Sequence, residues 1–197
     1  MRRRPLLSCA TLIFLALTAC MGSPRPSVES IRDVGEDEIV VVGRVELVPP
    51  LEKGEQKLKN MIGTGMLRNK LLLLTDEQWR TFEAEPGPGD HRLRIEAPFD
   101  ETFFVLSSKR PFYILVGELW LEAADKVYFP AGLKVNIRPT DRAIYIGTLR
   151  YQRDEFFHFP KFQIIDDYAR AQAEFRSKFG DRYLLRKELA VSVKERK

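Results

Sequence analysis

The sequence of 197 residues contains only two cysteines and two histidines. Two cysteines exclude a disulfide-rich scaffold and a four-cysteine zinc site. His91 and His158 have neither a His-x-x-x-His spacing nor a cysteine beside them, whereas catalytic triads and most zinc sites need a histidine close to a nucleophile or to further ligands. We therefore expect no metal, no cofactor and no catalytic residue, and expect that the chain is not an enzyme.

The carboxylates also lack the pattern of a hydrolase. They occur as the neighbours Asp100-Glu101, Asp154-Glu155 and Asp166-Asp167, and neighbours on a strand point to opposite faces. A glycosidase needs two carboxylates that face each other across a cleft. Gly63-Thr-Gly65 with Lys70 lacks the Gly-Lys-Ser/Thr ending of a phosphate loop, so we interpret it as a turn.

The N-terminal apolar run is too short to cross a membrane. It extends over about fourteen residues, from Leu6 to Ala19, after the arginines at positions 2–4, and a transmembrane helix needs about twenty. A positive segment followed by a short apolar one is typical of a secretory signal peptide, which we assign to residues 1–19.

The end of this segment, Leu17-Thr18-Ala19-Cys20, resembles the lipobox of bacterial lipoproteins. The resemblance implies that the peptide is cleaved before Cys20 and that Cys20 carries acyl chains anchoring the protein in a membrane. The absence of Asp at position 21 implies the outer membrane rather than the outer leaflet of the inner membrane. The alternative is an ordinary secretory signal with a chance cysteine at its cleavage site.

Little net charge is left after this processing. The chain has a formal charge of +4, but three of its 32 basic residues, Arg2 to Arg4, lie in the signal peptide, which has no acidic residue. The mature chain then has 29 basic and 28 acidic side chains. So small an excess gives no support to a nucleic-acid partner.

The mature chain is typical of a globular β protein, with 44% hydrophobic and 11% aromatic residues. Short apolar or alternating runs separated by turns predict about seven or eight strands. They cover residues 39–48, 66–74, 91–97, 102–106, 112–121, 133–137, 143–151 and 156–165, with a turn at 130–132. The pattern predicts an antiparallel β-sandwich.

One segment has helical spacing. Tyr168, Ala171, Phe175 and Phe179 share a face, so we expect one C-terminal helix at about 166–179, started by Asp166-Asp167 and ended at Gly180. Residues 183–193 could form a strand or a helix. The expected organisation is a lipid-anchored tether over 20–37 and a single domain over 38–197.

Three short motifs carry a further resemblance. Val41-Val-Gly-Arg-Val45, Phe129-Pro-Ala-Gly-Leu133 and Ile144-Tyr-Ile-Gly-Thr148 resemble segments of transthyretin-like and carboxypeptidase-regulatory-like β-sandwiches of bacterial envelope proteins. The last motif, followed by an Asp-Asp helix, is similar to bacterial lipoproteins of unassigned function. This implies a non-enzymatic structural or protein-interaction module, with another envelope protein or a cell-wall component as partner.

Aromatic side chains support a second hypothesis, a carbohydrate- or small-ligand-binding module. In adjacent pairs such as Phe103-Phe104 and Phe156-Phe157 one ring of each pair points outward on a strand, and outward rings suit a sugar platform. Trp79 and Trp120 are further candidates. The simpler interpretation places the second ring under the helix or a loop. An unrecognised hydrolase ranks third.

Overall fold

The computed structural model describes residues 25–52, 55, 69–79, 93–120, 126–154, 158–181 and 183–193, with only the backbone of Trp120. The signal peptide, Cys20, His91 and Phe156-Phe157 therefore lie outside the described residues. Within them the chain forms two mainly antiparallel sheets, one α-helix and one short 3-10 helix. None of the described helices is both long and apolar enough to cross a membrane.

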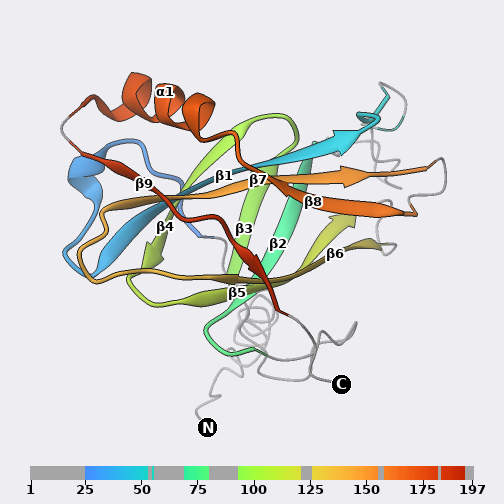
Figure 1. The fold of residues 1–197 in the computed structure, drawn as a ribbon, viewed down its shortest axis with the longest axis horizontal. Coiled ribbons are helices and arrows are strands. Elements are labelled where there is room, and N and C mark those ends of the chain that lie inside the picture. The colour runs from blue at the N-terminus through green and yellow to red at the C-terminus, as the bar shows by residue number, and fades with distance from the viewer. Residues whose placement is uncertain are drawn as a thin grey trace, which may run out of the picture.

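Each sheet has five strands (Figure 1). The β1 sheet is ordered β4 (Thr102–Ser108), β1 (Glu38–Val48), β7 (Ala143–Gln152) and β8 (Lys161–Ile165), with β9 (Leu185–Lys187) also paired to β7. The β5 sheet is ordered β10 (Val191–Ser192), β6 (Lys126–Val135), β5 (Phe112–Trp120), β2 (Lys70–Asp76) and β3 (Leu93–Pro98). The prediction of a mainly β chain with one C-terminal helix is confirmed.

The two sheets share one hydrophobic core. β1 shows why, because Ile39, Val41, Val45 and Leu47 are all buried in this core, as expected for alternate positions that share one face of a strand. Phe112, Ile114 and Leu119 of β5 face them from the other sheet, together with Leu71 and Leu73 of β2.

The strand number and the pairing differ from the expectation. The described residues hold ten strands, of which β9 and β10 are only three and two residues long. β7 pairs in parallel with β1 and with β9, so the β1 sheet is mixed rather than antiparallel. A parallel pair needs a long crossover connection, and here the chain between β1 and β7 builds most of the β5 sheet.

β7 pairs with β1 along its length, but at a bulge the strand on its other side changes. Val42 pairs with Tyr145 but Arg44 with Thr148, so β7 has one extra residue here. Gly147 lies at this bulge with a φ of +109°, a conformation that favours glycine. Before the bulge β7 pairs with β9, and after it with β8.

The turn predicted at residues 130–132 is wrong, because β6 continues through it. Ile114 pairs with Leu133 and Val116 with Pro130, so Ala131 and Gly132 form a bulge. Gly132 has a φ of +59°, and Pro130 is exposed and lies outside the part of β6 that pairs with β10. Turn-forming residue types therefore mark a bulge here.

Helix α1 (Tyr168–Phe179) lies across the outer face of the β1 sheet (Figure 1). Ala171 and Phe175 are buried in a second core, and Tyr168 and Phe179 pack against it, which confirms the predicted helical face. Gly180 ends the helix with a φ of +76° and donates its backbone N–H to the Arg176 carbonyl. Residues 183–193 form strands rather than a helix.

Residues 25–37, which were expected to belong to a tether over 20–37, are part of the fold. From Arg25 onward the chain packs on β4: the Val28 N–H donates to the Phe104 carbonyl and the Leu106 N–H to the Pro26 carbonyl. Val28, Ile31 and Val34 are buried in the second core, Ile31 from the short 3-10 helix Ile31–Asp33. These apolar residues sit between charged ones, which conceals their packing role in the sequence.

Candidate functional site

A cluster of charged and hydroxyl side chains lies on the outer face of the β1 sheet, beside the start of α1. We call it the polar patch. It combines strand residues with residues of the β3–β4 turn and of α1. Its members are Arg44, Glu46, Asp100, Thr102, Thr148, Arg150, Arg170 and Glu174. Strand register places Thr102, Arg44 and Thr148 in one row and Glu46 beside Arg150 in the next.

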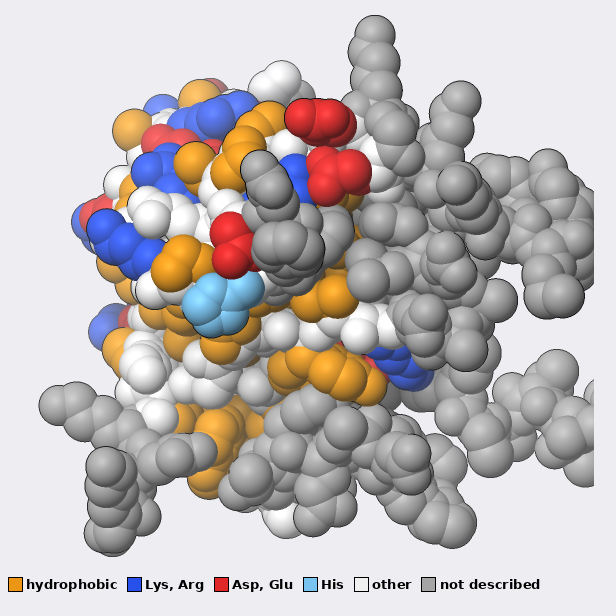
Figure 2. Space-filling model, turned by 90° about the vertical axis from the view of Figure 1, so that its right-hand side faces the viewer, with side chains coloured by type: hydrophobic (Ala, Val, Ile, Leu, Met, Phe, Trp, Pro, Cys, Tyr) orange, Lys and Arg blue, Asp and Glu red, His pale blue; other side chains and the backbone are white. Residues whose placement is uncertain are grey.

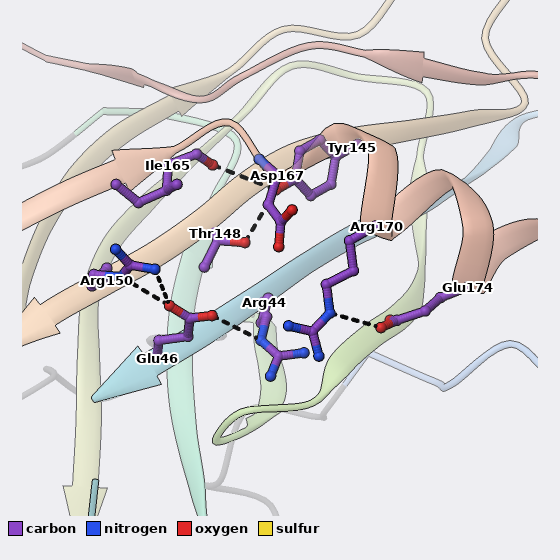
Figure 3. Close-up of polar contacts among 9 residues, drawn as sticks. All are labelled: Arg44, Glu46, Tyr145, Thr148, Arg150, Ile165, Asp167, Arg170 and Glu174. Atoms are coloured by element: carbon purple, nitrogen blue, oxygen red, sulfur yellow. Dashed lines mark hydrogen bonds and ion pairs between the residues drawn. The ribbon is translucent and has the colours of Figure 1, made fainter. Parts of the chain in front are cut away.

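Glu46 joins β1 to β7 within the patch (Figure 3). Its carboxylate accepts a hydrogen bond from Arg44 Nε at 3.1 Å and one from Arg150 Nε at 2.9 Å, and it forms an ion pair with Arg150 Nη2 at 2.8 Å. The Arg44 side chain is only 9% exposed. A buried guanidinium is stable only when charges nearby compensate for its lost hydration, and Glu46 provides the direct partner.

Helix α1 contributes a second charge pair. Arg170 Nε donates to Glu174 Oε1 at 3.0 Å, one helical turn apart. Burial alone would raise the pKa of Glu174, but hydrogen bonds from Thr102 and Arg170, with the charge of Arg44, hold that pKa below its usual value. The helix is thus linked to the strands β4 and β1 below it.

Asp100 lies at the edge of the patch in the turn between β3 and β4. Its φ of +61° is the left-handed conformation that aspartate tolerates better than most residues, and its backbone N–H donates to the Val45 carbonyl at 2.9 Å. Burial raises the pKa of Asp100, although Arg44 opposes this shift. The turn carries the chain from the β5 sheet to the β1 sheet.

The Tyr145 hydroxyl connects the patch to the helix (Figure 3). It lies 3.1 Å from Thr148 Oγ1, accepts the Asp167 N–H at 3.2 Å and donates to the Ile165 carbonyl at 3.4 Å. Burial raises the pKa of this phenol. The motif Ile144-Tyr-Ile-Gly-Thr148 and the Asp-Asp helix start are therefore in direct contact.

Asp100 and Asp167, from two of the carboxylate doublets, both interact electrostatically with Arg170, whereas Asp166 pairs with Lys187. Asp166 forms an ion pair with Lys187 at 2.8 Å, and its side chain also accepts the Tyr168 N–H at 3.2 Å. Both contacts lower the pKa of Asp166. Asp167 is the N-cap residue but makes no side-chain capping bond. Asp166 thus explains the helix start that the sequence predicted.

His158 is a surface residue, 75% exposed, and its Nδ1 lies 3.5 Å from Asp154 Oδ2. The Asp154 side chain also accepts the His158 backbone N–H at 2.8 Å, which closes a loop after β7. No group of three or more histidine, cysteine, aspartate or glutamate side chains within the described ranges is arranged to hold a metal ion.

Phe104 shows where an outward aromatic ring goes. Its ring packs edge-on against Phe179 of α1 at 5.5 Å, which confirms the simpler interpretation of Phe103-Phe104, since Phe103 is buried between the sheets. The near-parallel pair Tyr151 and Phe162 lies in the core. Trp79 and Tyr113 are tilted by 55° at 5.8 Å, which is not a flat sugar platform.

A small surface cavity of about 170 Å³ lies between the 3-10 helix and the end of α1. Glu29, Arg32, Lys178 and Tyr183 contribute to its lining, and Lys178 pairs with Glu29 at 3.1 Å. The polar patch, in contrast, lies on the outer face of the β1 sheet.

Sequence reasoning did not find the polar patch. Its signal is the change along β1 from outward Val40 and Val42 to outward Arg44 and Glu46. The contacts with Arg150 and α1 depend on strand pairing that spacing alone does not show. Comparison with protein-family models, curated proteins and solved structures finds no match for the chain.

Proposed function

We propose that this chain is a lipid-anchored protein of the bacterial envelope, held through acyl chains on Cys20, that acts as a non-enzymatic protein-interaction module. The observation that carries the proposal is the run Leu17-Thr18-Ala19-Cys20 at the end of a short apolar segment. Several acyl chains hold a protein firmly, since each buried methylene contributes about 0.8 kcal/mol. The outer membrane is the proposed location.

The polar patch is the proposed contact surface for an envelope protein or a cell-wall component. The side chains of Arg150 and Arg170 are 38% and 48% exposed, and that of Glu174 is 36% exposed. Charges of both signs on a sheet surface suit a partner with complementary charges, since such charges provide specificity and orientation. No nucleic acid is proposed as a partner.

For the domain itself we propose a β-sandwich of the transthyretin-like or carboxypeptidase-regulatory-like kind. Support comes from two sheets that share one core and from the motif residues Tyr145 and Thr148, whose side chains join β7 to the helix start. A carbohydrate-binding module and an unrecognised hydrolase stay alternative predictions.

The anchor is tested by metabolic labelling with palmitate in a bacterial host, followed by membrane fractionation. We expect Cys20→Ser to abolish both the label and the membrane association. Cys9→Ser is the matched control, because Cys9 lies inside the proposed signal peptide, and it is expected to keep both. Label that persists in Cys20→Ser would refute the proposal.

The contact surface is tested by placing a photo-crosslinking amino acid at Arg150 or Arg170 in intact cells. Arg32, which is exposed outside the patch, is the control position. We expect one protein or cell-wall adduct from the two patch positions and none from position 32. Adducts from position 32 alone would place the contact surface elsewhere.

A further inference from the structure

We infer that the end of the domain around Arg25 lies directly against the lipid headgroups, so that the opposite end of β1 points away from the membrane. The inference rests on the proposed acylation of Cys20. It adds an interaction surface, a phospholipid bilayer, and an orientation of the whole domain relative to that bilayer.

Only a short length of chain separates the proposed anchor from the fold. Five residue steps separate Cys20 from Arg25, and a fully extended chain covers at most about 3.6 Å per step, or about 18 Å. This upper limit holds for every conformation of the segment. A free tether as far as residue 38 would have allowed about 65 Å on the same basis.

Arg25 is a fixed point of the fold. Arg25 is only 7% exposed. Its backbone N–H donates to the Arg94 carbonyl at 2.6 Å, and its guanidinium carbon lies 4.8 Å from the centre of the Phe112 ring. The guanidinium also donates to Ser107 of β4 and to Thr75 of β2, the latter at 3.2 Å. Arg25 thus contacts both sheets, and an anchor at Cys20 stays within about 18 Å of this fixed point.

The residues around Arg25 suit a headgroup layer. Leu93, beside Thr75, is 41% exposed, and Trp79 packs on Tyr113 at 5.8 Å. Tryptophan and tyrosine, with an apolar ring and a polar edge, favour the membrane interface. Arg110 is paired with Glu77 at 3.3 Å. Charges at this end are of both signs. The short chain, rather than a net attraction to charged headgroups, therefore sets the distance between the domain and the bilayer.

The opposite end lies far from this anchor point. β1 starts at Glu38, opposite Ser108, and ends at Val48, opposite Gln152. Ten residue steps at about 3.3 Å give a separation of about 33 Å. His158 lies at this far end, because Asp154 bonds to its carbonyl and Arg153 to that of Val48. Figure 2 views this end, where charged side chains of both signs gather over the upper part of the view.

The test measures energy transfer from a dye on the protein to a headgroup-labelled lipid. If Cys20 is acylated and Cys9 removed, the mature chain has no other thiol, so Arg110→Cys and His158→Cys each provide one labelling site. Both side chains are more than 70% exposed and each forms one surface ion pair, so the variants are matched. The acylated full-length mature chain is inserted into vesicles of phosphatidylethanolamine and phosphatidylglycerol.

We expect transfer from position 110 to exceed that from position 158 by about twofold or more, because about 33 Å separates the two ends. Twenty Gly/Ser residues inserted after Ser23 add about 25 Å of mean reach and should reduce this difference. Equal transfer in the acylated chain, or more from position 158, would overturn the orientation and leave the anchor intact. A mature chain without acyl groups by mass would overturn both.

Discussion

The outer face of the β1 sheet has two halves that the same strands build differently. Under helix α1 the outward residues are apolar, as Val40, Val42 and Phe104 show, and they form the second core with Phe175. Beyond the start of the helix the outward residues become the charges and hydroxyls of the polar patch. The covered half therefore buries apolar surface that stabilises the fold, whereas the open half presents exposed charged side chains.

The largest difference between the halves should appear in stability. Phe175→Ala removes a fully buried ring from the covered half and should lower the free energy of unfolding by about 3–5 kcal/mol. Arg170→Ala in the open half removes one exposed ion pair and should cost about 0–1 kcal/mol. Urea unfolding of the mature chain measures both. Equal losses would remove the distinction between the halves.

The boundary between the halves is the bulge at Gly147. A Cβ at this position would lie 2.6 Å from Ile164 Cγ2, at a φ of +109°. Gly147→Ala should therefore destabilise the fold by about 2–3 kcal/mol. Gly132→Ala is the control, because its Cβ would meet only Trp79, at 3.6 Å, and a smaller loss is expected. Thermal unfolding compares the two, and a greater loss at Gly132 would argue against the bulge as the boundary.

Asp100 and Asp141 should respond to pH in opposite ways. Burial would raise the pKa of Asp141, but hydrogen bonds from Arg186, at 2.7 and 2.6 Å, and from the Arg138 N–H lower it overall. Stability from Asp141 is therefore present above its unfolded-state pKa of about 3.9 and is lost as the pH falls through its lower folded-state pKa.

Asp141→Asn should cost about 1.5–3 kcal/mol at pH 7, since it weakens hydrogen bonds to a charged group, and the cost should shrink in strong acid. Burial raises the pKa of Asp100, so its ionised form is disfavoured in the fold, and Asp100→Asn should be neutral or stabilising at pH 7. Unfolding midpoints between pH 2 and 7 measure both. A cost for Asp141→Asn that does not change with pH would contradict the ion-pair explanation.

The smallest expected loss of stability concerns the hydroxyl groups of two buried tyrosines of β7. Tyr145→Phe leaves the Asp167 N–H without its acceptor and should cost about 1–2 kcal/mol. Tyr151→Phe removes a hydroxyl that has no hydrogen-bond partner among the described residues, so it should be neutral or stabilising. Chemical denaturation of the two variants gives the comparison, and the reverse order would refute the role of Tyr145 at the helix start.

Local patterns predicted much of the fold. Alternation placed Ile39, Val41 and Leu47 in the core, and the 3.6-residue period placed Phe175 on the packed face of α1. The bulge at Ala131 and Gly132 was predicted as a turn, because bulges and turns both use residues that tolerate unusual backbone angles. Such residue types identify the local conformation but not whether the strand continues.

The candidate site was harder to predict, because it depends on contacts between distant segments. Glu46 and Arg150 meet only through the parallel pairing of β1 with β7, which no spacing in the sequence expresses. The packing of residues 25–34 was missed for a similar reason, since Val28, Ile31 and Val34 have no partner until β4 and α1 are in place. The acylation of Cys20, in contrast, is a prediction that rests on its immediate neighbours alone.

The most direct test of the account is the mass of the N-terminal peptide of the protein purified from bacterial membranes. We expect the chain to start at Cys20, to carry several acyl chains on this residue and to have no free thiol. A chain that starts at another residue, or that retains an unmodified Cys20, would contradict the membrane anchor and the orientation derived from it.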